Sequence, residues 1–179
     1  MPDSAITILL ADDDEDDRLM TRDALRDARL HNDLRFVIDG VDLMDYLQRR
    51  GRHADPQSSP RPGLILLDLN MPRMDGREAL RIIKADPELR RIPVVVLTTS
   101  KAEEDIYRSY DSGASSFISK PVTFAGLVEL MKGLGRYWFE MVDLPRQDER
   151  REVFNIFAAS IASANRSGAR DARGEHRRL

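Results

Sequence analysis

The sequence has 179 residues, of which 41% are apolar and 33% charged, a balance typical of a globular protein with one ordinary core and a short extension. Acidic residues (31) slightly outnumber basic ones (28), and a formal net charge of −3 argues against a nucleic-acid-binding domain, which is normally strongly basic. Cysteine is absent, and we find neither a secretory signal nor an apolar run long enough to span a bilayer, so we expect a cytoplasmic protein without disulfides or membrane contacts.

Five short apolar runs alternate along the chain with segments of helical periodicity. The runs that we predict to be strands are residues 6–11, 34–38, 64–67, 93–97 and 116–119. The segments that we predict to be helices begin near Glu15, Gly40, Gly76, Ser100 and Thr123. Strands separated by helices of this length pair in parallel through right-handed crossovers.

The lengths of the apolar runs predict the order of the strands. The runs at 6–11, 64–67 and 93–97 hold the longest unbroken stretches of apolar residues, so they belong in the centre of the sheet, where helices cover both faces. The more polar second and fifth runs belong nearer the edges. An α/β protein with a flavodoxin-like (βα)5 sandwich and a parallel sheet of order 2-1-3-4-5 satisfies both conditions.

Two helices carry more specific expectations. In the first helix, the residues that we expect to be buried are Leu19, Met20, Ala24, Leu25 and Ala28. The fourth helix begins with Ser100 and Glu103, whose spacing is that of a capping box.

The last helix is predicted to be extended. Apolar residues recur at steps of three and four from Phe124 to Trp138, Met141 continues the series, and Pro145 ends it, which gives a helix of about 22 residues. The stripe beyond Leu134 either packs on the sheet or forms the seam of a homodimer.

A change of composition after this helix suggests a domain boundary. We expect one domain over residues 1–145 and a charged extension over residues 146–179. The extension holds an apolar stripe at helical spacing and then an Arg-rich tail, so it is expected to be partly helical or disordered.

Carboxylates follow the first and third predicted strands. In an open α/β sheet, ligands bind beyond the carboxyl ends of the strands where the strand order reverses, which here is between these two strands. Asp12 and Asp13 follow the first strand, and Asp68 follows the third. Capping of the next helix explains Asp14, but it does not explain a carboxylate directly after residues 64–67, which costs free energy unless something compensates it.

The acidic residues predict a Mg²⁺ site. Carboxylates within a few ångströms repel one another, and Mg²⁺ relieves this by binding one or two of them together with water and a phosphate oxygen. Asp13 and Asp68 are the predicted direct ligands, Asp12 is predicted to bind through water, and the backbone carbonyl of Asn70 to point back toward the metal. Calcium is an alternative, although no EF-hand spacing occurs. The histidines lack metal-ligand spacing and are expected on the surface: His31, His53 and His176.

The fourth and fifth strands end in residues that suit the same site. Thr98 and Thr99 place hydroxyl groups beside the predicted pocket, and Lys120 and Pro121 follow the fifth strand. An ammonium group near Asp68 would neutralise charge and bind a phosphoryl oxygen. A solvated loop lysine is the simpler reading of Lys120 alone, but the combination of groups at successive strand ends favours the functional one.

These motifs resemble the response-regulator receiver family over about residues 5–135. The matching residues are Asp12 and Asp13 after ITILLA, Asp68 in LILLDLNMPRMDG, Thr98 in PVVVLTTS, and Phe117 with Lys120 in GASSFISKP. These separated motifs agree with the family in order and in spacing, so the resemblance is specific.

The resemblance implies a role for each matching residue. Asp68 would be the phosphoacceptor, Asp12 and Asp13 would hold Mg²⁺, Thr98 would bind the phosphoryl group, and Lys120 would pair with it. The chain would then be a single-domain response regulator that takes its phosphoryl group from a sensor histidine kinase. It would not be an enzyme apart from its own phosphorylation and dephosphorylation.

Two further features follow from the resemblance. Phe117 would occupy the aromatic switch position, where tyrosine is more common, so that Thr98 and Phe117 form the switch. The Pro-containing loop before the third strand and the ending at residues 137–145 are similar to stand-alone regulators paired with bacterial and cyanobacterial phytochromes. Such regulators tend to form homodimers through the last helix, so we expect a homodimer here.

Three other functions fit part of the sequence. A Mg²⁺-dependent phosphohydrolase with an aspartyl nucleophile needs an acid two residues after the nucleophile, where this chain has Asn70. A flavin or nucleotide binder needs a Gly-rich or Ser/Thr-rich loop after the first strand, where residues 13–17 are acidic. The third alternative is a receiver-shaped scaffold that is never phosphorylated, although such a scaffold has no need of Thr98 and Lys120.

Overall fold

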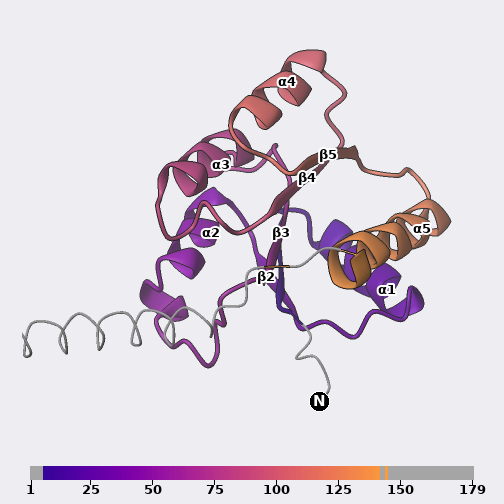
Figure 1. Cartoon of the computed structure of the whole chain (residues 1–179), viewed down its shortest axis with the longest axis horizontal. Helices are drawn as coiled ribbons and strands as arrows, with labels where there is room; N and C mark the ends of the chain where they lie inside the picture. Colours follow the sequence, from indigo (N-terminus) through magenta and orange to yellow (C-terminus); the bar gives the residue numbers. More distant parts are fainter. Residues whose placement is uncertain (1–5, 142–143, 145–179) are drawn as a thin grey trace, which may run out of the picture. The chain divides into compact units, whose positions relative to one another are not determined.

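The computed structural model describes residues 6–141 and residue 144, and it confirms the predicted fold (Figure 1). The strands are β1 (Ile8–Ala11), β2 (Leu34–Val37), β3 (Leu64–Leu67), β4 (Val94–Thr98) and β5 (Ser116–Ser119). The helices are α1 (Glu15–Asp27), α2 (Gly40–Leu47), α3 (Gly76–Ala85), α4 (Glu103–Asp111) and α5 (Phe124–Gly135). The predicted extension over residues 146–179 lies outside the described residues.

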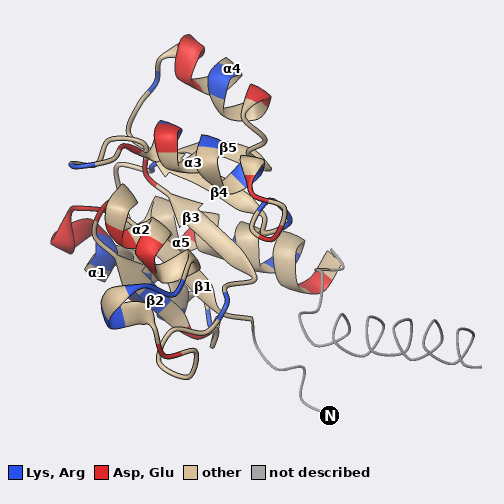
Figure 2. Ribbon diagram, turned by 90° about the vertical axis from the view of Figure 1, so that its left-hand side faces the viewer, with Lys and Arg blue, Asp and Glu red and all other residues tan. Residues whose placement is uncertain are grey.

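All five strands are parallel, in the predicted order β2-β1-β3-β4-β5. Figure 1 shows α1 and α5 on one face of the sheet and α2, α3 and α4 on the other. Every residue of β1, β3 and β4 is buried, whereas β2 and β5 at the edges are partly exposed. The central strands are free of charged residues, which gather instead on the helices and loops (Figure 2). Apolar burial on both faces therefore holds the sheet together and places its strand ends.

The buried face of α1 differs from the prediction. The sheet-facing stripe consists of Thr21, Ala24 and Leu25, which are buried. Leu19 and Met20 are 38% and 43% exposed, so the expectation for these two residues is wrong. At about 100° per residue, Leu19 lies on the opposite side of the helix from this stripe, and Met20 lies at its margin although it stands four residues before Ala24.

The last helix is extended, and its geometry changes along its length. α5 ends at Gly135, and the chain continues as a π-helical turn at Arg136–Met141. A Cβ atom at Gly135 would lie 2.6 Å from the Leu30 side chain, so this glycine permits close packing on the loop after α1. Trp138 is buried and Met141 is 74% exposed, so the apolar stripe beyond α5 has both a packed and an open part.

A buried polar cluster ties α2 to the long loop before β3. His53 is buried rather than on the surface as predicted, whereas His31 is exposed and His176 lies outside the described residues. The His53 ring places Nε2 2.8 Å from Asp42 Oδ1 and Nδ1 3.2 Å from Ser59 Oγ. Both ring nitrogens thus have polar partners, which offsets the cost of burying the ring.

Asp42 is the centre of this cluster. Its carboxylate also accepts hydrogen bonds from the Ile38 backbone N–H at 3.0 Å and from the Arg52 guanidinium. Burial raises the pKa of the Asp42 carboxyl, but the hydrogen bonds from His53, Ile38 and Arg52 outweigh burial and hold the pKa below its usual value. The ionised form is therefore the one that stabilises the folded chain.

We expect Asp42→Asn to lower the free energy of unfolding at neutral pH by about 2–4 kcal/mol, because it removes a buried charge that several donors share. The stabilisation by the Asp42 carboxylate is fully present above the unfolded-state pKa of about 3.9, and it is lost as the pH falls through the lower folded-state value. Urea unfolding at several pH values, comparing the variant with the wild type, measures both effects.

Asp45→Asn is the matched control on the same helix. Asp45 forms an exposed pair with Arg50, and such pairs contribute about 0–1 kcal/mol. If Asp42→Asn cost no more than Asp45→Asn, the cluster would not stabilise the loop.

Candidate functional site

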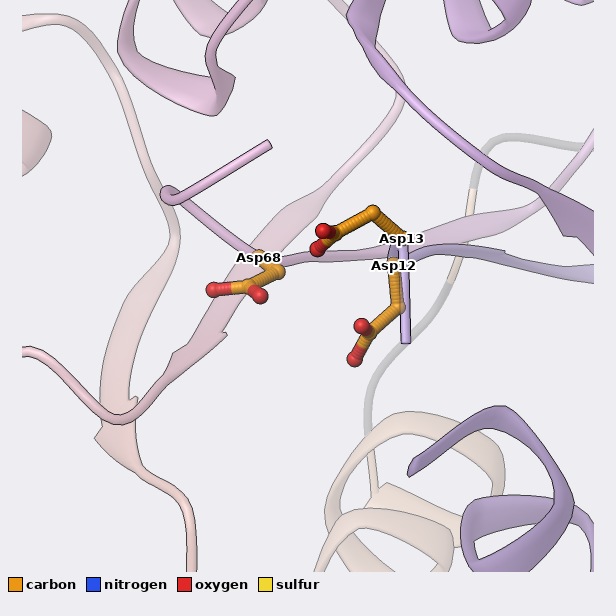
Figure 3. A group of neighbouring side chains, drawn as sticks. All are labelled: Asp12, Asp13 and Asp68. Atoms are coloured by element: carbon orange, nitrogen blue, oxygen red, sulfur yellow. The ribbon is translucent and has the colours of Figure 1, made fainter. Parts of the chain in front are cut away.

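Asp12, Asp13 and Asp68 come together at the carboxyl edge of the sheet, as the sequence predicts (Figure 3). β1 and β3 are neighbours, with Ala11 beside Leu67, so the residues that follow them leave the sheet at the same place. A carboxylate oxygen from each of the three aspartates lies within 4.8 Å of the other two. Asp12 and Asp68 are buried, whereas Asp13 is exposed, so the cluster is open to solvent on one side.

Lys120 reaches this cluster from the end of β5. Its Nζ lies 2.7 Å from Asp12 Oδ2, 2.8 Å from Asp17 Oδ2 and 3.5 Å from Asp68 Oδ2. Burial by itself lowers the pKa of Lys120, but the hydrogen bonds with Asp12 and Asp17 raise it above its usual value. Lys120 is therefore a fixed cation of the site rather than a solvated loop residue.

Asp17 is a partner of Lys120 that the sequence analysis did not assign. It lies in the first turn of α1, where its negative charge also suits the helix dipole. The sequence signals this role only by placing Asp17 four residues, or one helical turn, after Asp13. Acidic residues are common in the first turn of helices without pairing with a lysine.

The pKa of the Asp12 carboxyl is raised within the cluster. Burial raises its pKa above the usual value, the hydrogen bond and charge of Lys120 act in the opposite direction, and the charge of Asp68 raises it further. A divalent cation relieves this kind of repulsion, and oxygen ligands at this spacing are those that Mg²⁺ prefers. The residues present thus fit a small, hard cation.

The loop after Asp68 is shaped by Gly76, the first residue of α3. Its N–H donates a hydrogen bond to the Leu69 carbonyl at 2.8 Å. A Cβ atom at this position would lie 2.1 Å from the Asp68 carbonyl oxygen, so a side chain does not fit. The Asn70 N–H donates to Asp68 Oδ1 at 3.4 Å. That the Asn70 backbone carbonyl points toward a bound metal stays a prediction.

Thr98 ends β4 and is fully buried. Its Oγ1 accepts a hydrogen bond from the Ser100 N–H at 3.3 Å, and its carbonyl accepts one from the Lys120 N–H at 2.8 Å. The Thr98 hydroxyl therefore lies on the strand next to β3, with the Ser100 N–H in the loop after β4 as its hydrogen-bond partner.

Phe117 lies in β5 beside Val96 of β4. Its side chain is partly buried and packs against the main core. Its backbone N–H donates to the Tyr110 hydroxyl at 3.2 Å, which joins α4 to the edge strand.

The predicted capping box of α4 is wrong. The N-cap of α4 is Ala102, with no side-chain hydrogen bond, and the Ser100 hydroxyl instead donates to Asp105 Oδ2 at 2.6 Å. The hydroxyl proton of Ser100 thus goes to a carboxylate that Arg77 holds in place, while its oxygen accepts the Ala102 N–H at 3.4 Å rather than an N–H in the first turn of α4.

Comparisons with known proteins agree with this geometry. The family model described as "Response regulator receiver domain" matches residues 8–132. Response regulator Rcp1 of Synechocystis sp. is 41% identical over 138 residues, which is 77% of this chain and 92% of that protein.

Solved structures give the same result. The phosphorylated cyanobacterial phytochrome response regulator RcpA has a TM-score of 0.74 and 40% identity, over 79% of this chain and 99% of that one. The Mn²⁺-bound form of Rcp1 has a TM-score of 0.71 and 40% identity, with the same coverage. The likeness thus extends over nearly the whole of each related chain.

Proposed function

The chain belongs to the response regulator receiver family, and on that premise we propose that Asp68 accepts a phosphoryl group from a sensor histidine kinase. The chain would act as a single-domain response regulator of a two-component phosphorelay. The observation that carries the proposal is the meeting of Asp12, Asp13 and Asp68 with the Lys120 ammonium at one sheet edge.

In the proposed reaction, a carboxylate oxygen of Asp68 attacks the phosphorus of a phosphohistidine. An O–P bond forms, the P–N bond breaks, and the imidazole leaves with the bonding electron pair. Lys120 neutralises charge beside the acceptor and pairs with a phosphoryl oxygen of the product. Mg²⁺, held by Asp13 and Asp68 with Asp12 and the Asn70 carbonyl, would supply further neutralisation of the phosphoryl oxygens.

The phosphorylated state would be read through Thr98 and Phe117. The Thr98 hydroxyl moves toward the new phosphoryl oxygens and brings the loop after β4 with it. Phe117 then changes its packing on the core, and the surface formed by α4, β5 and α5 changes. Apart from its own phosphorylation and dephosphorylation, the chain catalyses nothing in this proposal.

Partner and location follow from the same proposal. The similar protein RcpA is a cyanobacterial phytochrome response regulator, which supports a phytochrome-type sensor kinase as the partner. No helix among residues 6–141 is both long and apolar enough to cross a membrane. We place the chain in the cytoplasm, with a receiver domain over residues 1–145 and an extension over residues 146–179, and without nucleic acid or membrane as a partner.

A homodimer through the last helix region is part of the proposal. Tyr137 and Met141 are 50% and 74% exposed in the π-helical turn, so apolar surface is open there. Sedimentation velocity with and without beryllofluoride tests for a dimer and for its dependence on the occupied site.

Incubation with acetyl phosphate and Mg²⁺, followed by intact-protein mass spectrometry, tests the proposed function. We expect one phosphoryl group per chain, and none when EDTA removes the metal. An unphosphorylated scaffold would gain no group under either condition. A phosphohydrolase would release inorganic phosphate through many turnovers without accumulating the adduct.

A further inference from the structure

A polar network outside the acidic cluster joins α3, α4 and the loop after β4. The Arg77 guanidinium binds Asp105 with two hydrogen bonds, from Nε to Oδ1 at 2.7 Å and from Nη2 to Oδ2 at 2.6 Å. Asp105 Oδ2 also accepts the hydroxyl of Ser100 at 2.6 Å. A single carboxylate thus fastens the loop to two helices.

Both ends of this network lie beside the proposed phosphoryl site. At one end, the Ser100 N–H donates to Thr98 Oγ1 at 3.3 Å. At the other end, the Arg77 guanidinium lies 3.4 Å from Oδ1 of Asn70, two residues after Asp68. The network therefore connects the residue that is proposed to move with the loop of the proposed acceptor.

The central ion pair is partly buried and remains charged. The Asp105 side chain is 14% exposed, and that of Arg77 is 32% exposed. Hydrogen bonds from Arg77 and then Ser100 lower the pKa of Asp105 to about 2, so the carboxylate stays ionised at neutral pH. A bidentate pair of this kind fixes geometry more firmly than a single hydrogen bond does.

We propose that Arg77 and Asp105 form a latch that holds Ser100 and Thr98 in the position that they take while Asp68 is unphosphorylated. The latch rests on the proposed function, because the switched position of the loop has a role only if Asp68 is phosphorylated. In the proposed switch, Thr98 moves toward the phosphoryl group and Ser100 moves with it, and the hydrogen bond from Ser100 to Asp105, which two bonds from Arg77 hold in place, opposes this movement. The latch therefore sets how much of the protein adopts the switched loop before phosphorylation.

Arg77→Gln and Asp105→Asn, singly and together, test the latch in the full chain. Backbone amide NMR signals of residues 98–102 are recorded without ligand and compared with those of the wild type bound to Mg²⁺ and beryllofluoride. We expect each single variant to shift these signals toward the bound position and to bind beryllofluoride about three- to tenfold more tightly. The double variant should show nearly the same amide shifts and beryllofluoride affinity as either single variant, because both changes open the same latch.

Two further variants separate the latch from a general structural role. Lys132→Gln breaks the exposed pair of Lys132 with Glu129 on α5 and should change neither readout. Arg77→Lys keeps the charge but cannot form the two parallel hydrogen bonds of the guanidinium. Its amide shifts and beryllofluoride affinity should therefore lie between those of the wild type and of Arg77→Gln.

Three results would overturn the latch. Arg77→Gln that lowers the urea midpoint but leaves the amide signals and the affinity unchanged would show a purely structural residue. Weaker beryllofluoride binding would show that Arg77 contacts the phosphoryl group itself. If the wild type failed to bind beryllofluoride with Mg²⁺, the proposed function would fail and the latch with it, whereas the first two results leave that function intact.

Discussion

Asp68→Asn is expected to lower the rate of phosphoryl uptake from acetyl phosphate by a factor on the order of 10³ or more, as loss of a nucleophile generally does. The amide has no anionic oxygen to attack phosphorus, and it also weakens the cluster that Asp68 forms with Asp12 and Asp13. The time course of the phosphorylated species by intact-protein mass spectrometry measures this rate.

Asp16→Asn is the matched control for this change. Asp16 is an exposed acid in the first turn of α1, so the substitution removes the same charge close to the site without touching the cluster. Its uptake should stay near the wild-type rate. Equal rates for Asp68→Asn and the wild type would rule out Asp68 as the acceptor.

Gly76→Ala is expected to destabilise the chain by about 3 kcal/mol, because the added Cβ meets backbone rather than a flexible side chain. It would lie 2.1 Å from the Asp68 carbonyl oxygen and 2.8 Å from the Leu69 Cα. Relief of this overlap moves the backbone of Asp68, so phosphoryl uptake should fall too, by about 10- to 100-fold. Urea unfolding and the mass assay measure the two effects.

Gly133→Ala shows what the same substitution does where there is room. A Cβ atom at Gly133 has no neighbour within 4 Å, and this residue is exposed within α5. The alanine should therefore stabilise the chain by about 0.5–1 kcal/mol through helix propensity. Similar destabilisation by both substitutions would contradict the account of the loop after Asp68.

The sheet and the acidic cluster were predictable because both follow from local pattern and topology. Apolar runs such as residues 64–67 identify central strands, and parallel strands bring the residues after their ends to one edge. Asp12, Asp13 and Asp68 therefore needed only the strand order to be placed together, and the structure confirms their proximity.

Contacts between side chains of different elements were not predictable in this way. His53 is buried because Asp42 and Ser59 receive its ring, and neither partner stands at a spacing that signals this. The Ser100 hydroxyl turns to Asp105, which Arg77 fixes from another helix. Such pairs depend on how helices pack, which periodicity within one helix does not encode.

Anomalous X-ray scattering from crystals grown with Mn²⁺ in place of Mg²⁺ is the most direct test of the site. We predict one strong peak within bonding distance of carboxylate oxygens of both Asp13 and Asp68, and its loss in crystals of Asp13→Asn. A peak elsewhere on the protein, with these two side chains turned away from each other, would contradict the site on which the phosphoryl chemistry rests.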